Sequence, residues 1–497
     1  MKSSFYQEIQ SERDVTGDNF SKGEINFNWT MSENAYFNPH KSYIRLRFSL
    51  TKSDGATQLE KSDNIAPNMF LVDNLFQQMS MSINNTVVSE ISDYVAQVAS
   101  LKHRMYKSEE HMNNLLSITM FSDAYGSERQ SQVIAPDSTK NQIKSYQVFE
   151  NQAGTVGVVV DGTMTLGTAN TTLDVGDTVI LDDGREFPII TKTNTETFAT
   201  TALKAELVAT SNGTWGIKRS VRHYDDKIWH NRSLNRGKTT FEALYSLPMG
   251  FFDIDEFVPG CQGLFNLKLT PQASEIMKLC AVESLSGVDI APTNNYRFNV
   301  ESMNLYLLKG LGAPVTNKTI NLKMRESRCQ SQNLTTNSLH QKTFQVHPNT
   351  QELTLAFQEP GASIVSNAFS AAKFKSNNSN EQKLTRFYIN YGGKQLPSPI
   401  PDIEFSSSKD FLVQRYVESL NYTNALHSPE PLRKWIERGP YYHFSGYSES
   451  EKEDRVYVSS QFSAFSGNNP NMLLFDHYLK NVTISISGSK IQDVKCY

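Results

Sequence analysis

The chain has 497 residues, of which only 38% are apolar, and its formal net charge at pH 7 is −4. This length exceeds what one hydrophobic core holds, which predicts two or three domains, and the slightly acidic balance argues against a main role in coating nucleic acid. Aromatic residues reach 11%, a share that argues against disorder and suits the space between packed β-sheets.

The first part of the chain alternates apolar and polar residues, which predicts antiparallel strands buried on one face. The pattern occurs in INFNWTM from Ile25, in SYIRLRFSLT from Ser42 and in MSMSINNTVVS from Met79. Asn84 and Asn85 interrupt the last segment, and such a pair predicts a hairpin turn.

One helix is predicted over about residues 92–114. Its apolar face repeats at helical spacing through Tyr94, Val98, Leu101 and Met105. Ser92 or Asp93 provides an N-cap. No other segment has as clear a helical pattern, so we expect one main helix.

Composition changes over residues 152–217, where Thr, Val and Gly become frequent and Phe and Tyr rare. Asp161-Gly162 and Asp183-Gly184 are typical of tight turns between short strands. We expect four or five strands here, which would form a small all-β module inserted into a larger domain.

The stretch YSLPMGFFDIDEFVPGCQGLFNLKLTP, residues 245–271, predicts a corner followed by a strand. Pro and Gly break a strand ladder at the corner, and Phe265, Leu267 and Leu269 alternate inward in the strand. Three carboxylates lie within it, at Asp253, Asp255 and Glu256. They could bind a divalent cation or lie on a solvated loop, and the absence of the calcium-loop spacing favours the loop.

A second series of predicted strands begins with YRFNVESMNLYLLKG from Tyr296. It continues through KTFQVHP, QELTLAFQEPG and LTRFYINYGG, and it ends with LLFDHYLKNVTISISG from Leu473. Many short strands in two series predict an all-β chain built from two sandwiches.

Other residue patterns do not assemble a site of catalysis, cofactor binding or metal binding. His103 and His111 share a face of the predicted helix, and His223 and His230 flank Asp225 and Asp226, but no HExxH occurs. The Gly-Gly-Lys after Tyr391 lacks the spacing of a phosphate loop and predicts a turn, and no GxSxG occurs. The run SESEKEDR from Ser448 indicates a charged loop. We therefore predict no enzyme and no cofactor.

The chain has four cysteines, Cys261, Cys280, Cys329 and Cys496, and no CxxC pair. This usage predicts neither a zinc site nor a disulfide framework, and indicates maturation in a reducing compartment. We expect no signal peptide and no transmembrane helix, since the first residues lack an apolar core and no apolar run approaches the length of a span.

Three stretches together resemble the double jelly-roll major capsid proteins of eukaryotic double-stranded DNA viruses, including virophages and Polinton-like viruses. They are NLFQQMSMSINNTVVSE from Asn74, the stretch from Tyr245 to Pro271, and LTRFYINYGGKQLPSPIP from Leu384. The resemblance implies two tandem eight-stranded jelly rolls, 1–272 and 273–497, with the 152–217 module inserted in the first. It also implies that the strand from Leu264 is the last strand of the first jelly roll.

The resemblance further implies a major capsid protein whose pseudo-hexagonal homotrimers tile the icosahedral shell of a virion assembled inside a host cell. Expected partners are neighbouring capsomers and the penton and minor capsid proteins. It implies no direct sequence-specific binding of nucleic acid, and it allows an inner membrane beneath the shell.

Two other readings stay open. A viral attachment or carbohydrate-binding β-sandwich protein would use the inserted module as its binding element, with aromatics such as Trp215 stacking on sugars. A β-sandwich glycoside hydrolase would use two carboxylates, although no pair stands out from the strand pattern.

Overall fold

The computed structural model describes most of the predicted strands and both ends of the chain. The described residues are 3–17, 19–57, 65–67, 71–106, short strands between 133 and 218, 240–272, 279–281, 296–335, 339–358, 373–375, 381–397, 410–423, 432, 435, 440–445, 453–462 and 471–497.

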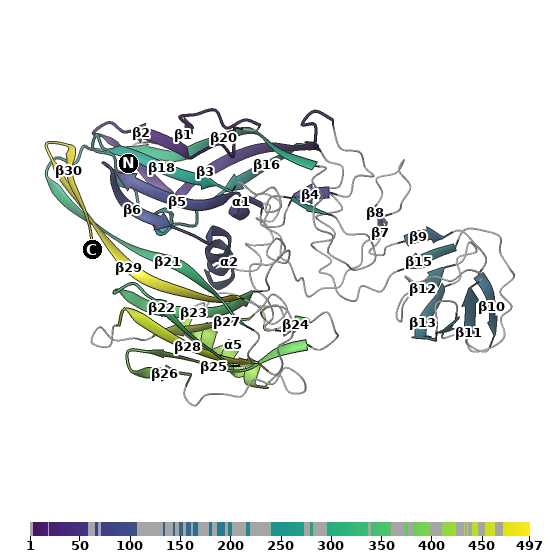
Figure 1. Cartoon of the computed structure of the whole chain (residues 1–497). Helices are drawn as coiled ribbons and strands as arrows, with labels where there is room; N and C mark the ends of the chain where they lie inside the picture. Colours follow the sequence, from purple (N-terminus) through teal and green to yellow (C-terminus); the bar gives the residue numbers. More distant parts are fainter. Residues whose placement is uncertain are drawn as a thin grey trace.

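Two antiparallel β-sandwiches make up the main body of the chain (Figure 1). One sheet of the first sandwich has the order β1 (Ser3–Gln10), β20 (Tyr296–Leu311), β3 (Ala35–Lys52) and β16 (Thr240–Tyr245), with β17 (Val258–Pro259) also paired to β3. The facing sheet has the order β2 (Ile25–Thr30), β18 (Leu264–Pro271), β5 (Phe76–Ile83) and β6 (Thr86–Ile91).

The second sandwich follows the same plan. One sheet has the order β21 (Lys318–Asn333), β29 (Asn471–Ser487), β23 (Thr350–Gln358) and β27 (Tyr441–Ser445), with β30 (Lys490–Cys496) also paired to β29. The facing sheet has the order β22 (Leu339–Gln345), β28 (Arg455–Phe462), β25 (Glu381–Tyr391) and β24 (Lys373–Lys375), with β26 (Lys394–Leu396) on β25.

Three smaller groups of strands complete the described sheets. A seven-stranded sheet has the order β10 (Val156–Val160), β11 (Thr163–Leu166), β14 (Thr197–Thr200), β13 (Glu186–Lys192), β12 (Thr178–Ile180), β15 (Trp215–Lys218) and β9 (Phe149–Gln152). Two short pairs join β4 (Ile65–Pro67) to β19 (Leu279–Ala281), and β7 (Val133–Ile134) to β8 (Ile143–Lys144).

The seven-stranded sheet occupies the region where the composition changes. Its strands pair with one another, and five of them, β10 to β14, fall in the Thr-rich stretch for which four or five strands were predicted. The predicted turns at 161–162 and 183–184 lie outside the described residues.

The position of β20 corrects the sequence-based division of the chain. We assigned this strand to the second series, but it pairs with β3 from Tyr296 opposite Lys52 to Leu311 opposite Ala35, and with β1 on its other side. The first sandwich therefore takes strands up to Leu311, not up to Gln272, and β18 is not its last strand. Alternation predicts a half-buried strand but says nothing about which distant strand it joins.

Aromatic rings fill the core of the first sandwich. Phe265 of β18 stacks on Trp29 of β2 with ring centroids 5.6 Å apart, and meets Phe37 of β3 edge-on at 5.2 Å. Trp29 and Phe37 also meet edge-on, at 5.9 Å. The three rings join both sheets, so the predicted inward alternation of β2, β3 and β18 is confirmed.

Two helices of three or more turns are described. The predicted one is α2 (Val95–Tyr106), and residues 107–114 of that prediction lie outside the described residues. Tyr94 precedes α2 with φ +56°, and its carbonyl accepts the Val98 amide at 3.0 Å. Two single turns, α1 (Leu71–Asn74) and η1 (Gly250–Asp253), lie nearby in the first sandwich.

The other helix, α5 (Asp410–Thr423), was not predicted, so the expectation of one main helix is wrong. Its buried face carries Arg415 and Ser419, while Val417 is 44% exposed. Leu412, Tyr416 and Leu420 nevertheless recur at helical spacing in this segment, and Tyr416 packs against the core, so a helical pattern was present in the sequence and was overlooked.

Replacing Phe265 by alanine should lower the free energy of unfolding by about 3–5 kcal/mol, because it removes the ring that contacts both Trp29 and Phe37 and leaves a large cavity beside them. Urea unfolding followed by tryptophan fluorescence measures the change. The matched control is Leu264→Ala on the same strand, where the side chain is 40% exposed. Equal losses in the two variants would contradict the assignment of this core.

Candidate functional site at the junction of the two sandwiches

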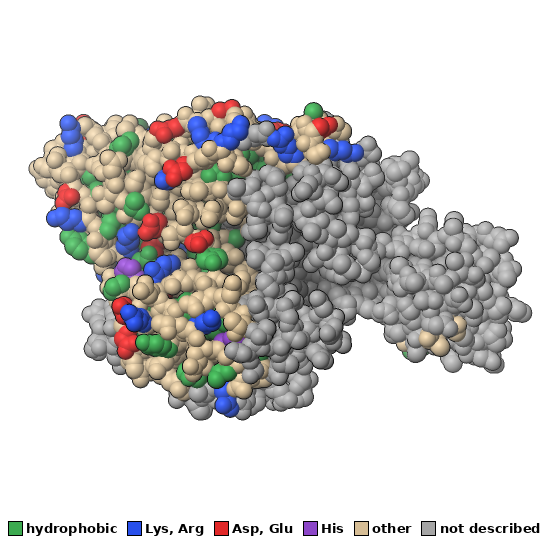
Figure 2. Space-filling view, in the orientation of Figure 1, with side chains coloured by type: hydrophobic (Ala, Val, Ile, Leu, Met, Phe, Trp, Pro, Cys, Tyr) green, Lys and Arg blue, Asp and Glu red, His purple; other side chains and the backbone are tan. Residues whose placement is uncertain are grey.

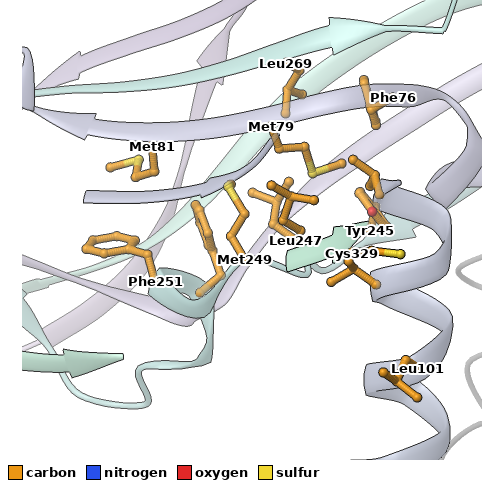
Figure 3. Close-up of a cluster of buried hydrophobic side chains, with 14 of the residues drawn as sticks. Phe76, Met79, Met81, Leu101, Tyr245, Leu247, Met249, Phe251, Leu269 and Cys329 are labelled. Atoms are coloured by element: carbon orange, nitrogen blue, oxygen red, sulfur yellow. The ribbon is translucent and has the colours of Figure 1, made fainter. Parts of the chain in front are cut away.

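Helix α2 lies between the two sandwiches, in contact with β5 of the first and β21 of the second (Figure 1). Apolar side chains from these elements meet there (Figure 3). The figure labels Met79 and Met81 of β5, Leu101 of α2, Cys329 of β21 and the corner residues Leu247, Met249 and Phe251. All of these side chains are buried, so the corner predicted from the sequence is part of the junction.

Glu326 of β21 makes the polar contact at the centre of this junction. Its carboxylate accepts the hydroxyl of Ser89 on β6 at 2.5 Å and the amide of Gly250 in η1 at 3.3 Å. The Ser89 hydroxyl oxygen also accepts the Phe251 amide at 3.2 Å. Two groups without a helical partner at the start of η1 are thereby satisfied by the other sandwich and by β6.

Burial raises the pKa of Glu326 to about 7, and the hydrogen bond from Ser89 opposes that shift. The side chain is only 2% exposed, and a charged carboxylate loses its hydration there. The junction therefore tolerates Glu326 best in its neutral form.

The three carboxylates of the corner do not converge on a common point. Asp253 accepts the Lys102 ammonium of α2 at 2.6 Å, whereas Asp255 accepts the Asn38 side-chain amide at 3.0 Å and pairs with Lys41 at 3.4 Å. Glu256 is exposed. Among the described residues no group of three or more His, Cys, Asp or Glu side chains could hold a metal ion.

The segment that links the sandwiches, residues 312–317, is bonded to both of them. The Gly312 amide donates to Asn34 at 2.9 Å, and Tyr36 donates to the Ala313 carbonyl at 2.5 Å, both in the first sandwich. On the other side, the Ser489 amide donates to the Thr316 carbonyl at 3.2 Å, and the Gly488 amide donates to Asn317 at 3.1 Å. A linker held at both ends restricts rotation of one sandwich against the other.

The remaining candidate residues from the sequence have ordinary positions or lie outside the described residues. His103 lies on α2, and Gly392 and Gly393 form the predicted turn between β25 and β26 with φ +60° and +72°. His111, His223, His230 and residues 448–452 lie outside the part described.

The sequence analysis missed the buried polar residues of the second sandwich. Asp476 and His477 interrupt the apolar run LLFDHYL and are buried, which is the signal that could have marked them. Glu326 and Ser89 stand in polar stretches of their strands, and no pattern in the sequence distinguishes them from exposed neighbours.

Comparison with known proteins addresses the fold. No protein-family model matches the chain, and no curated protein matches it. Among solved structures, the Faustovirus major capsid protein aligns with 98% of this chain and 90% of its own, at 10% identity and a TM-score of 0.51.

A chain in the cryo-EM structure of the Sputnik virophage aligns with 100% of this chain and 88% of its own, at 13% identity and a TM-score of 0.50. The mavirus major capsid protein aligns with 99% of this chain and 90% of its own, at 11% identity and a TM-score of 0.49. The matches to the Faustovirus and Sputnik chains extend over both sandwiches.

The chain has the double jelly-roll fold. The fold expected from the three resembling stretches is thus confirmed, and the identities of 10% and 13% carry the comparison no further than the fold. In the described part of both jelly rolls, no helix has the length and apolar character needed to cross a membrane.

Glu326→Gln should stabilise the junction of the two jelly rolls at alkaline pH. Because the folded-state pKa is raised to about 7, the stability linked to Glu326 is complete below its ordinary pKa of 4.5 and is lost as pH rises through 7. The neutral variant avoids this loss. The difference between its free energy of unfolding and that of the wild type should therefore grow from near zero at pH 4.5 to about 3 kcal/mol at pH 8.

Urea unfolding at several pH values measures that difference. Glu90→Gln, at an exposed carboxylate next to Ser89, is the matched control and should show no such growth. If the difference in free energy of unfolding between Glu326→Gln and the wild type stayed constant with pH, this would contradict the burial of the carboxylate.

Gly250→Ala should destabilise the chain by about 1–3 kcal/mol, because overpacking would push the two jelly rolls apart. A Cβ atom at this position would lie 2.5 Å from the Arg325 carbonyl oxygen of β21 and 2.9 Å from a Glu326 oxygen. Thermal unfolding compares it with Gly23→Ala, where a Cβ atom meets nothing within 4 Å. A melting temperature equal to that of the control would show that η1 and β21 are not in contact.

Proposed function

We propose that this chain is the major capsid protein of a virus and that its biological form is a homotrimer that tiles an icosahedral shell. The observation that supports the proposal is the double jelly roll itself, matched over nearly the whole chain by the Faustovirus major capsid protein. Two similar sandwiches in one chain give a pseudo-twofold unit, and three such units give a pseudo-hexagonal outline.

The junction suits a subunit that must keep its shape while neighbours press on it. The 312–317 linker is bonded to both jelly rolls, and Glu326 joins β21 to β6 and η1. A close-packed protein interior transmits strain and does not absorb it. A rigid unit presents the same lateral surfaces in every copy of the shell.

The charges on the described surface also suit close packing of identical copies. Figure 2 shows Lys and Arg side chains intermixed with Asp and Glu over the described part of one face. Several are paired across strands, as Arg45 is with Glu242 at 2.8 Å. A net charge of −4 limits repulsion between neighbours, and an intermixed surface does not favour sequence-specific contact with nucleic acid.

The proposed partners are neighbouring capsomers, penton proteins and minor capsid proteins, in a virion whose shell can enclose an inner membrane. We also propose that the seven-stranded sheet is a module inserted into a loop of the first jelly roll. Chain order supports this, since the module follows α2 and precedes β16, and both elements belong to that half of the chain.

The oligomeric state tests the proposal. Purified protein should elute as a trimer of about 168 kDa, three times the chain mass of 56.1 kDa, when size-exclusion chromatography is coupled to light scattering. Negative-stain images should show compact particles with a hexagonal outline. A monomer that stays monomeric at high concentration and at varied ionic strength would overturn the proposed function.

A further inference from the structure

Four side chains form a hydrogen-bonded chain on one sheet of the second jelly roll, and a carboxylate lies beside one end of it. Ser327 Oγ lies 2.8 Å from His477 Nδ1, and His477 Nε2 lies 2.9 Å from Thr354 Oγ1. Thr354 Oγ1 lies 2.7 Å from His443 Nδ1, and His443 Nε2 lies 3.3 Å from a Glu352 carboxylate oxygen. The chain therefore crosses four neighbouring strands, β21, β29, β23 and β27.

Thr354 has a single hydroxyl proton, so it donates to one of the two imidazoles and accepts from the other. A neutral imidazole donates through one ring nitrogen and accepts through the other. The chain is therefore satisfied when both histidines are neutral, in either direction along it.

The surroundings oppose any added positive charge. His443 is 1% exposed and His477 is 2% exposed. Glu352 already forms an ion pair with the Arg325 guanidinium, so its charge is balanced. The charged groups that act on the chain are Arg325 on β21, Lys102 on α2 and Glu352 on β23. Other charged or titratable groups contact residues next to it: Tyr106 of α2 lies against Arg325, Arg104 of α2 against Tyr441, Arg415 of α5 acts on Tyr442, and Glu326 adjoins Ser327.

Both imidazoles accordingly resist protonation. Burial lowers the pKa of His443 to about 3 and the pKa of His477 well below its ordinary value, and the nearby Arg325 guanidinium lowers both further. These groups favour the folded state above the ordinary histidine pKa of 6.5, and that contribution is lost as pH falls below it.

The helices that cover this sheet are attached through the same residues. The Arg325 guanidinium lies over the Tyr106 ring of α2, 4.9 Å from its centroid, and the Arg104 guanidinium of α2 lies 5.0 Å from the Tyr441 ring of β27. Ser419 of α5 accepts the backbone amide of His443 at 3.2 Å. Movement of His443 would therefore disturb the contact with α5, and movement of Arg325 would disturb the contact with α2.

We propose that this hydrogen-bonded chain is an acid-sensitive latch, which holds α2 and α5 on the second jelly roll while both histidines are neutral and releases them when both take up protons.

The geometry explains why release of the helices requires a proton on both histidines. One added proton, on either ring, is accommodated because the Thr354 hydroxyl can still donate to the imidazole that stays neutral. With both rings protonated, an N–H from each side points at Thr354 Oγ1, and the threonine hydroxyl proton then has no acceptor in the chain. Two imidazolium rings, with centroids 5.7 Å apart, would also face Arg325 with one carboxylate among them.

Hydrogen–deuterium exchange of the full-length protein between pH 7.5 and pH 4 tests the latch, with labelling times corrected for the intrinsic effect of pH. In the wild type, protection of peptides from α2 and α5 should fall together as pH decreases. The midpoint of this loss should lie at about pH 5. In His443→Gln/His477→Gln, which cannot take up these protons, the midpoint should fall by about one pH unit or more. An unchanged midpoint would overturn the proposal.

Two single variants control for other histidines. His340→Gln alters a buried histidine on β22 that packs against Phe462, and His40→Gln alters an exposed one. Both should keep the wild-type midpoint. A shift in either variant as large as that of the double variant would assign the transition to a different group.

A second measurement on the wild type keeps the test decisive if the double variant does not fold. Deuterium exchange at imidazole C2, read by mass spectrometry, gives the titration of each histidine separately. His443 and His477 should titrate together at the pH where α2 and α5 lose protection. Neutral histidines through that transition, or titration near pH 6.5 without loss of protection, would overturn the latch.

Discussion

The pairing of β20 with β3 is the constraint on which the arrangement of the two jelly rolls depends. It runs along almost the whole of both strands, and only the six residues 312–317 separate its end from the start of β21. The first jelly roll is therefore completed by the strand that leads directly into the second. Hydrogen bonds to Asn34 and from Tyr36, Gly488 and Ser489 then hold this short connection from both sides.

Burial of polar groups at the junction follows from that constraint. With so short a connection, β21 lies against β6 and η1, and the Glu326 side chain is buried between them. The Ser89 hydroxyl and the Gly250 amide donate to its oxygens, but burial is the larger effect and raises its pKa to about 7, so the buried group is favoured in its neutral form. In the second jelly roll the two neutral histidines follow the same rule, since Ser327 and Thr354 bond three of their four ring nitrogens.

The sequence predicted the fold well where a residue pattern is typical of only one kind of secondary structure. Alternation located β2, β3, β5 and β18, and the apolar face from Val98 to Met105 located α2. It was wrong about β20, because strand pairing depends on residues more than 200 positions apart, such as Arg45 and Asn304. It missed α5, whose buried face includes Arg415 and Ser419.

The candidate site was less accessible to sequence reasoning than the fold. Asp253, Asp255 and Glu256 were weighed together because they are close in sequence, yet the fold sends Asp253 to α2 and Asp255 to β3. The candidate site is built from side chains of distant segments that meet at the junction, so no local sequence motif marks it.

A cryo-EM map of the purified assembly, resolved to separated strands, tests the central claim most directly. The account predicts threefold particles in which every copy contributes two jelly rolls joined side by side, with β20 between β1 and β3 of the same chain. A map in which each copy contributes a single sandwich to the ring, or in which β20 joins the second sandwich, would contradict it.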